Sequence, residues 1–185
     1  YSIYPKNPKV NSYSFSQRSF LFFDPARNYL ATDRVFSNSI RKSFLNTSSL
    51  SLDYTNRYVY LTSSFDPTRS SDGVELPENT GYTYGDLEVN YRSDQRKRFN
   101  LDTKVTYGTF YNGTKFTVEN EINWRKQPIF NASMIVNFNA IELPKPYASR
   151  NLWLVSPKVD FTFTKTLTWT TFVQYNSQGE NLGVN

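Results

Sequence analysis

The sequence predicts an all-β fold, specifically an antiparallel up-and-down transmembrane β-barrel of which this chain forms a part, with about eight or nine strands. Three observations lead to this prediction. Apolar and polar residues alternate with a period of two along most of the chain. Aromatic residues make up 17% of the sequence. The alternating runs are about 10–14 residues long, whereas about 5–6 is typical of globular proteins and about 9–11 suffice to cross a bilayer at a tilt.

Nine segments of the chain show the period-two pattern, and none shows a helical period of 3.6 with helix caps. In chain order the predicted strands are 10–23, 29–44, 49–62, 82–92, 99–111, 114–125, 129–141, 152–164 and 167–176. The terminal stretch QYNSQGENLGVN reads as a turn followed by the start of another strand. We therefore expect residues 1–185 to be a segment of one outer-membrane barrel domain that is incomplete at both ends.

The stretch FNLDTKVTYGTFYNGTKFTVENEINWR, residues 99–125, is the clearest hairpin. Its Asn112-Gly113 pair predicts a two-residue type I′ turn, because both central residues of such a turn need positive φ. That turn pairs Lys104 with Glu121 and places Asn120 opposite Val105. Asn120 is then the one polar residue that does not fit an otherwise apolar face.

The two faces of the predicted strands differ sharply in chemistry. Charged residues that we expect to face a barrel lumen are Asp102, Lys104, Glu119, Glu121, Arg125, Lys158 and Asp160. Residues that we expect to face lipid are Leu101, Val105, Tyr107, Phe116, Val118, Ile122, Trp124, Phe161, Phe163 and Trp169. Lumen residues either line a pore or interlock to fill it, and the sequence leaves that choice open.

The connections between the predicted strands also favour a membrane barrel. Every second connection is short: LNTSS, SDQRKR, KQP and TKT. The two long polar connections, SSFDPTRSSDGVELPENTG and ELPKPYASRN, lie at the opposite end of the sheet, both at the same end. Aromatic residues recur near strand ends, where girdles at the headgroup level would lie. A soluble β-sandwich or extended lectin-like sheet remains the competing architecture.

The composition argues against several kinds of chemistry. The chain has no histidine and no cysteine, so it cannot supply a Ser-His-Asp or Cys-His centre by itself. We expect no enzyme activity, no catalytic residues, no cofactor and no metal site. Asp66, Asp72 and Glu75 lack the spacing of a calcium loop, and we interpret them as a solvated loop.

The net charge of +5 permits contact with anionic partners without requiring it. The basic run Arg92, Arg96, Lys97 and Arg98 lies in one short turn without stacking aromatics arranged around it, so we expect no nucleic-acid binding. Such a turn at the periplasmic end of a barrel could still contact a partner.

Residues 146–185, PYASRNLWLVSPKVDFTFTKTLTWTTFVQYNSQGENLGVN, resemble the C-terminal β-barrel region of a family of large Bacteroidetes outer-membrane proteins. Residues 64–100 and 108–125 resemble the same family. Its members typically carry an N-terminal domain similar to carbohydrate-binding family 9, for which this chain has no counterpart. The shared motifs are structural rather than catalytic.

The resemblance implies a barrel segment in the bacterial outer membrane, in contact with outer-membrane lipid and lipopolysaccharide. The expected role is that of a scaffold or an accessory subunit of an envelope complex, with other outer-membrane or periplasmic proteins as partners. One alternative is a pore or transporter for small solutes such as glycans or peptides. A second alternative is a soluble β-sandwich binding module.

Overall fold

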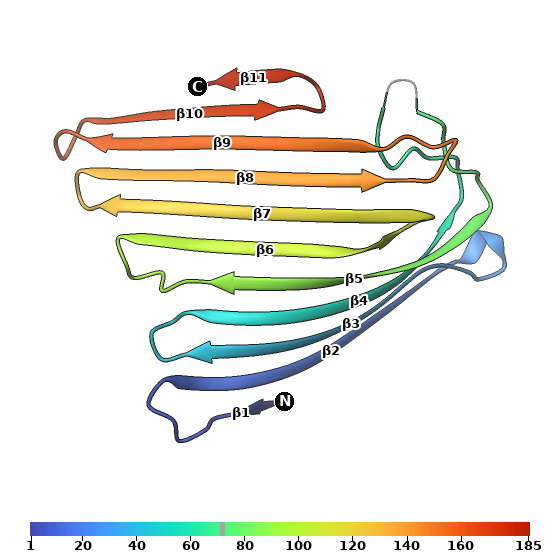
Figure 1. Cartoon of the computed structure of the whole chain (residues 1–185), viewed down its shortest axis with the longest axis horizontal. Coiled ribbons are helices and arrows are strands. Elements are labelled where there is room, and N and C mark those ends of the chain that lie inside the picture. The colour runs from blue at the N-terminus through green and yellow to red at the C-terminus, as the bar shows by residue number, and fades with distance from the viewer. Residues whose placement is uncertain (71–72) are drawn as a thin grey trace.

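The computed structural model describes residues 1–70 and 73–185, which form one antiparallel sheet of eleven strands in up-and-down order (Figure 1). The strands are β1 (Ser2–Ile3), β2 (Val10–Asp24), β3 (Leu30–Phe44), β4 (Ser49–Leu61), β5 (Thr80–Arg92), β6 (Phe99–Phe110), β7 (Gly113–Lys126), β8 (Phe130–Glu142), β9 (Arg150–Thr162), β10 (Thr168–Asn176) and β11 (Asn181–Val184). One 3-10 turn, η1 (Pro25–Arg27), joins β2 to β3. Within the described ranges, no helix combines the length and the apolarity that a membrane span requires.

The all-β prediction is confirmed, and β2 to β10 coincide with the nine predicted segments. The two-residue β1 is too short to give a periodic signal, and β11 follows the predicted final turn. In the described part of the chain, β1 and β11 are the two edges of the sheet, which is therefore open rather than closed into a barrel. Every turn on one side of the sheet is short, whereas the two longest connections, 62–79 and 143–149, lie together on the other side (Figure 1).

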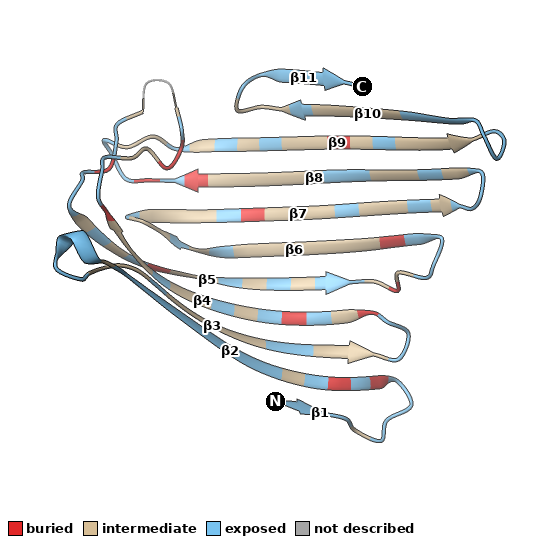
Figure 2. Cartoon of the chain, turned by 180° about the vertical axis from the view of Figure 1, so that it is seen from behind, coloured by how far each residue is buried: buried red, intermediate tan, exposed pale blue. Residues whose placement is uncertain are grey.

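The sheet is a single layer without a conventional hydrophobic core. Among the described residues, the buried apolar side chains are those of Val10, Leu61, Leu76, Tyr84, Ile141 and Leu143. Buried positions are few and scattered, and no strand is buried along its length (Figure 2). The described residues thus do not form the two packed sheets that the β-sandwich alternative requires.

The strand register divides the side chains into two faces. The apolar face carries rows such as Leu52, Val89, Val105, Val118, Phe138 and Trp153 on β4 to β9. The polar face carries rows such as Ser51, Asn90, Lys104, Glu119 and Asn137 on β4 to β8. Many large apolar side chains are solvent-exposed, among them Tyr107, with 60% of its surface accessible. One face of the sheet is therefore both apolar and uncovered.

The strands are staggered progressively in one direction. One row of directly paired residues runs through Ser37, Thr55, Asp86, Gly108, Lys115, Ile141 and Arg150 on β3 to β9. Ser37 lies seven residues inside β3, which begins at Leu30, whereas Arg150 is the first residue of β9. Over the six strand-to-strand steps from β3 to β9, the strand ends on the side of the long connections therefore shift by seven residues relative to this row. The strands run obliquely to any line drawn through their ends.

The predicted register of the 99–125 hairpin is wrong by two residues. Phe110 pairs with Gly113, so Tyr111 and Asn112 form the turn, and of these only Tyr111 has positive φ, 52°. A Cβ atom at position 113 would lie 2.0 Å from the Glu142 carbonyl oxygen. Gly113 is therefore explained by the close approach of the β8 end rather than by a turn conformation. A shift of two residues leaves every side chain on its predicted face.

Candidate functional site

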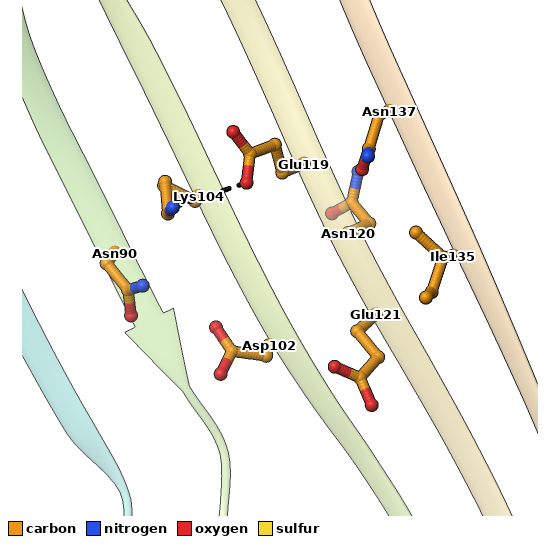
Figure 3. A pocket seen from close by; sticks show the side chains of 8 residues that line it. All are labelled: Asn90, Asp102, Lys104, Glu119, Asn120, Glu121, Ile135 and Asn137. Atoms are coloured by element: carbon orange, nitrogen blue, oxygen red, sulfur yellow. Dashed lines mark ion pairs between the residues drawn. The ribbon is translucent and has the colours of Figure 1, made fainter. Parts of the chain in front are cut away.

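Two adjoining hollows on the polar face form the candidate site. The polar-face residues that line the first are Asn90, Asp102, Lys104, Glu119, Glu121, Ile135 and Asn137 (Figure 3). The second is lined by residues of β4 to β8, including Arg57, Tyr84, Asp86, Glu88 and Lys115, and shares Glu119 with the first. Together they extend across the central strands of the sheet, and eight of their twenty lining residues are charged.

Four of the predicted lumen residues come together in the first hollow. Lys104 Nζ lies 3.2 Å from Glu119 Oε2, and these residues are paired directly across β6 and β7 (Figure 3). Asp102 lies opposite Glu121, and each carboxylate has another partner: Arg92 Nε lies 3.7 Å from Asp102, and Asn123 donates to Glu121 at 3.1 Å. These partners make the carboxylates part of a charged network that water can solvate.

The other predicted lumen residues lie on the same face but in different surroundings. Arg125 lines a separate hollow at the short-turn end. Lys158 pairs with Asp160 at 3.3 Å, and Thr170 donates to Asp160 at 2.8 Å. The seven residues therefore share a face without forming one site. Sequence reasoning did not single out Arg57, Asp86, Glu88 or Lys115, although the alternation of β4, β5 and β7 places them on the charged face.

The predicted lipid-facing residues share the apolar face, with Phe163 following β9 in the turn and stacking on Phe161 at 4.7 Å. Asn120 was expected to be a misfit opposite Val105. It lies instead opposite Thr103, whose hydroxyl donates to its side-chain oxygen at 2.9 Å. The corrected register thus gives the two polar groups a mutual hydrogen bond on an apolar face.

The connection 62–79 folds over the polar face at one end of the second hollow. Phe65 packs on Tyr111 with ring centroids 5.9 Å apart, and Tyr111 packs on Tyr84 at 5.1 Å. Tyr84 belongs to the polar face of β5 and is buried. Burial, and after it the nearby Tyr84 phenol, raises the pKa of Tyr111 to about 12. The Tyr111 phenol therefore stays neutral. Aromatic packing therefore anchors the start of the connection.

A second anchor lies at β9, two strands beyond the β6–β7 turn that carries Tyr111. Arg150, at the start of β9, donates from Nη1 to the Arg69 carbonyl at 3.2 Å. The connection between β4 and β5 rises beside the ends of β5 to β8 to the level of β9 (Figure 1). Leu76 and Thr68 within it are fully buried. The connection is thus a packed element that covers one end of the polar face.

Asp66 organises this connection by local hydrogen bonds. Its carboxylate accepts from the Thr68 amide and hydroxyl and from the Ser70 amide, each at 2.8 Å. Burial acts to raise the pKa of Asp66, but these hydrogen bonds outweigh it and hold the pKa below its usual value. Glu75 accepts from Ser64, and Asp72 lies outside the described residues. Within the described ranges, no cluster of three or more possible metal ligands occurs.

Searches of protein-family models, curated proteins and solved structures found no match to this chain. The resemblance to the Bacteroidetes outer-membrane family therefore stays a prediction.

Proposed function

We propose that this chain forms part of the wall of an outer-membrane β-barrel, with its apolar face toward lipid and its polar face toward the lumen. In this role it is a membrane-spanning scaffold whose lumen is narrowed by connection 62–79. The lipid-facing set is then the apolar face around Tyr107, and the lumen set is the charged face around Lys104.

The observation that carries this proposal is the progressive stagger of the strands. A barrel requires strands tilted about 35–45° to its axis and a register that shifts steadily in one direction. A shift of seven residues over six steps, with about 3.3 Å per residue and about 4.8 Å between strands, corresponds to a tilt of about 39°. The stagger therefore matches the geometry of a closed barrel.

The uncovered apolar face supports the membrane setting. A soluble protein rarely leaves an apolar patch of this extent without a partner, because exposed patches above a few hundred Å² promote association. In a bilayer the same face is solvated by lipid, and the polar groups of the opposite face keep their water. The outer edges of β1, β2 and β11 would then have to be paired by further strands, since lipid offers no hydrogen bonds.

Site-directed spin labelling of the reconstituted full-length protein tests the orientation. A label replacing Tyr107 should be accessible to oxygen dissolved in lipid, and a label replacing Lys104 should be accessible to a water-soluble nickel chelate. Residues 1–185 contain no cysteine, so a single cysteine introduced at either position is the only label site within this segment. Lipid accessibility at Lys104 together with water accessibility at Tyr107 would contradict the proposal.

A narrow pore for small polar solutes is the second candidate function, and the two charged hollows favour it. Planar-bilayer recordings separate the two candidates. A pore should conduct in steps, and Lys104→Glu should shift its reversal potential in a salt gradient toward cation selectivity, with Lys126→Glu on the other face as the matched control. A correctly inserted barrel that does not conduct would contradict the pore and favour the scaffold role.

A further inference from the structure

A basic hollow lies at the short-turn end of the polar face, beyond the two charged hollows described above. It is lined by Gln95, Arg96, Lys97, Arg98, Arg125 and Gln127 and has a volume of about 540 Å³. The turn 93–98 between β5 and β6 and the turn 127–129 between β7 and β8 supply most of its wall, and both lie at the same end of the sheet (Figure 1). Four of the six lining residues are cationic and none is acidic, so this hollow differs in charge from the other two.

The strand register explains why this hollow lacks carboxylates. Three successive cross-strand pairs of β6 and β7 follow one another on the polar face toward the turn: Asp102–Glu121, Asn100–Asn123 and Arg98–Arg125. At about 3.3 Å per residue, the backbone of the acidic pair lies about 13 Å from that of the arginine pair. That separation exceeds the screening length of about 8 Å at physiological ionic strength. A row of neutral asparagines thus separates the arginines from the carboxylates of the first charged hollow.

The two arginines lie directly opposite each other, an arrangement in which like charges destabilise a sheet. The Arg125 amide donates to the Arg98 carbonyl at 2.7 Å, which fixes this pairing. In the part of the chain that the structure describes, the side chains of Lys97 and Arg98 make no ion pair and no hydrogen bond, and both residues are exposed. An anion bound between the guanidinium groups would replace their repulsion by attraction to a shared partner.

Hydrogen bonds hold the surrounding turn in shape. Asp94 accepts from Arg96 Nε at 3.0 Å and from the Thr47 hydroxyl of the neighbouring turn at 3.0 Å. Arg96 is therefore neutralised, and its role is to fix the turn. Arg125 donates from Nη2 to the carbonyls of Gln95 and Lys97, which fixes the position of its guanidinium group. The hollow is thus built into the hairpin ends.

The free donors of the hollow match the oxygens of a phosphate group. Because Arg125 engages the carbonyls through Nη2 alone, its Nε and Nη1 groups have no hydrogen-bond partner within residues 1–70 and 73–185. A guanidinium group can bind two phosphate oxygens at once, and Lys97 adds a compact positive charge. The hollow is also larger than a phosphate ion, since its volume lies in the range of about 300–1,000 Å³ typical of small-molecule sites. It can therefore hold a small polar molecule that carries a phosphate.

We propose that Arg98, Arg125 and Lys97 bind the phosphate group of a small polar solute, free or esterified, at the short-turn mouth of the lumen. The location in the lumen rests on the proposed function, because it requires the polar face to line the barrel. The phosphate site itself rests on the opposed arginines. Arg96 and Asp94 are positioning residues that hold the turn.

Isothermal titration calorimetry of the purified full-length protein in a non-ionic detergent tests the site. Glucose 6-phosphate and inorganic phosphate should bind saturably, and glucose should not; the first two titrations show whether the ester or the free ion binds more tightly. Arg98→Gln removes a charged donor and should weaken phosphate binding about tenfold or more. Arg98→Lys keeps the charge without the planar fork, so it should weaken binding less.

Lys126→Gln is the matched control. Lys126 follows Arg125 directly but belongs to the other face of β7, so its replacement removes the same charge and should leave the affinity for phosphate nearly unchanged. No saturable binding of either phosphate ligand by the unaltered protein would overturn the site. An equal loss in the control would also overturn it, because binding would then depend on net charge alone. Acetate bound as tightly as phosphate would replace it with a general anion site.

The result also separates this site from the proposed function, because binding in detergent does not depend on insertion. Absent phosphate binding together with a lipid-accessible label at Tyr107 would reject the site and keep the barrel wall. Saturable binding that Arg98→Gln weakens, together with a lipid-accessible label at Lys104, would keep the phosphate site and reject its location in a lumen.

Discussion

At the scale of single residues, the apolar face contains one polar pair whose energetics differ between lipid and water. The Thr103 hydroxyl donates to the Asn120 side-chain oxygen across β6 and β7 at 2.9 Å. An unpaired amide in hydrocarbon has no alternative partner, so the pair is expected to behave as a unit.

Replacing one member of this pair should cost more than replacing both. Thr103→Val leaves the Asn120 amide unpaired and should destabilise the protein by about 1–3 kcal/mol, whereas Thr103→Val with Asn120→Leu should be close to neutral. Urea-induced unfolding from lipid vesicles measures both variants. Equal costs for the single and the double variant would show that this face is in water.

Gly113 provides a second residue-level prediction. A Cβ atom there would meet the Glu142 carbonyl oxygen at 2.0 Å and Leu143 Cα at 2.9 Å, so Gly113→Ala should cost about 1–3 kcal/mol or more. Gly183 on β11 is the matched control, because a Cβ there meets no atom within 4 Å. Gly183→Ala should leave the unfolding midpoint nearly unchanged. A tolerated alanine at position 113 would contradict the close approach of β8.

Asp94 gives the turn 93–98 a defined pH dependence. Hydrogen bonds from the Arg96 side chain and backbone, more than any other cause, lower the pKa of Asp94 below its usual value of 3.8. The charged carboxylate therefore stabilises the folded turn above pH 3.8, and this contribution is lost as the pH falls through the lowered pKa. Carboxyl NMR shifts should show titration only below 3.8, and Asp94→Asn should abolish the dependence. Titration at or above 3.8 would count against the contacts with Arg96.

At the scale of elements, alternation alone was enough to predict the nine long strands and their two faces. It could not predict the turn at Tyr111-Asn112. The glycine at position 113 is required by the nearby Glu142 carbonyl on β8, a contact that the local sequence does not reveal. The contacts that anchor connection 62–79 could not be predicted from alternation either. Arg150 and Arg69 are 81 residues apart in sequence, and only the folded sheet brings them together.

Those anchors predict how connection 62–79 responds to mutation. Phe65→Ala with Arg150→Gln removes the packing on Tyr111 and the hydrogen bond to Arg69, which should lower local stability by about 1–2 kcal/mol. Trypsin cleavage after the exposed Arg69 should then be about tenfold faster. Cleavage after Arg27, in the distant connection between β2 and β3, serves as the internal control. Equal acceleration at both sites would indicate general unfolding instead.

At the scale of the whole molecule, the single-layer sheet explains why conventional stability arguments do not apply. Only six apolar residues are buried in the described part of the chain, far fewer than the packed core of a two-layer domain of this length would contain. A bilayer removes this difficulty, because it solvates the apolar face and forces the backbone hydrogen bonds to remain within the sheet. For the proposed barrel wall, the orientation of the strands relative to the membrane is the property that follows most directly from the stagger.

The stagger of the strands predicts that orientation quantitatively. Seven residues of shift over the six steps from β3 to β9 correspond to strands inclined about 39° to the axis of the proposed barrel. Polarised infrared spectroscopy of the full-length protein in oriented bilayers should therefore give a mean strand tilt of about 35–45° from the membrane normal. A sheet lying flat on the surface by its apolar face would place the strands nearly parallel to the membrane plane. That result would replace the barrel wall with a peripheral lipid-binding sheet, because the same apolar face would then contact only one leaflet.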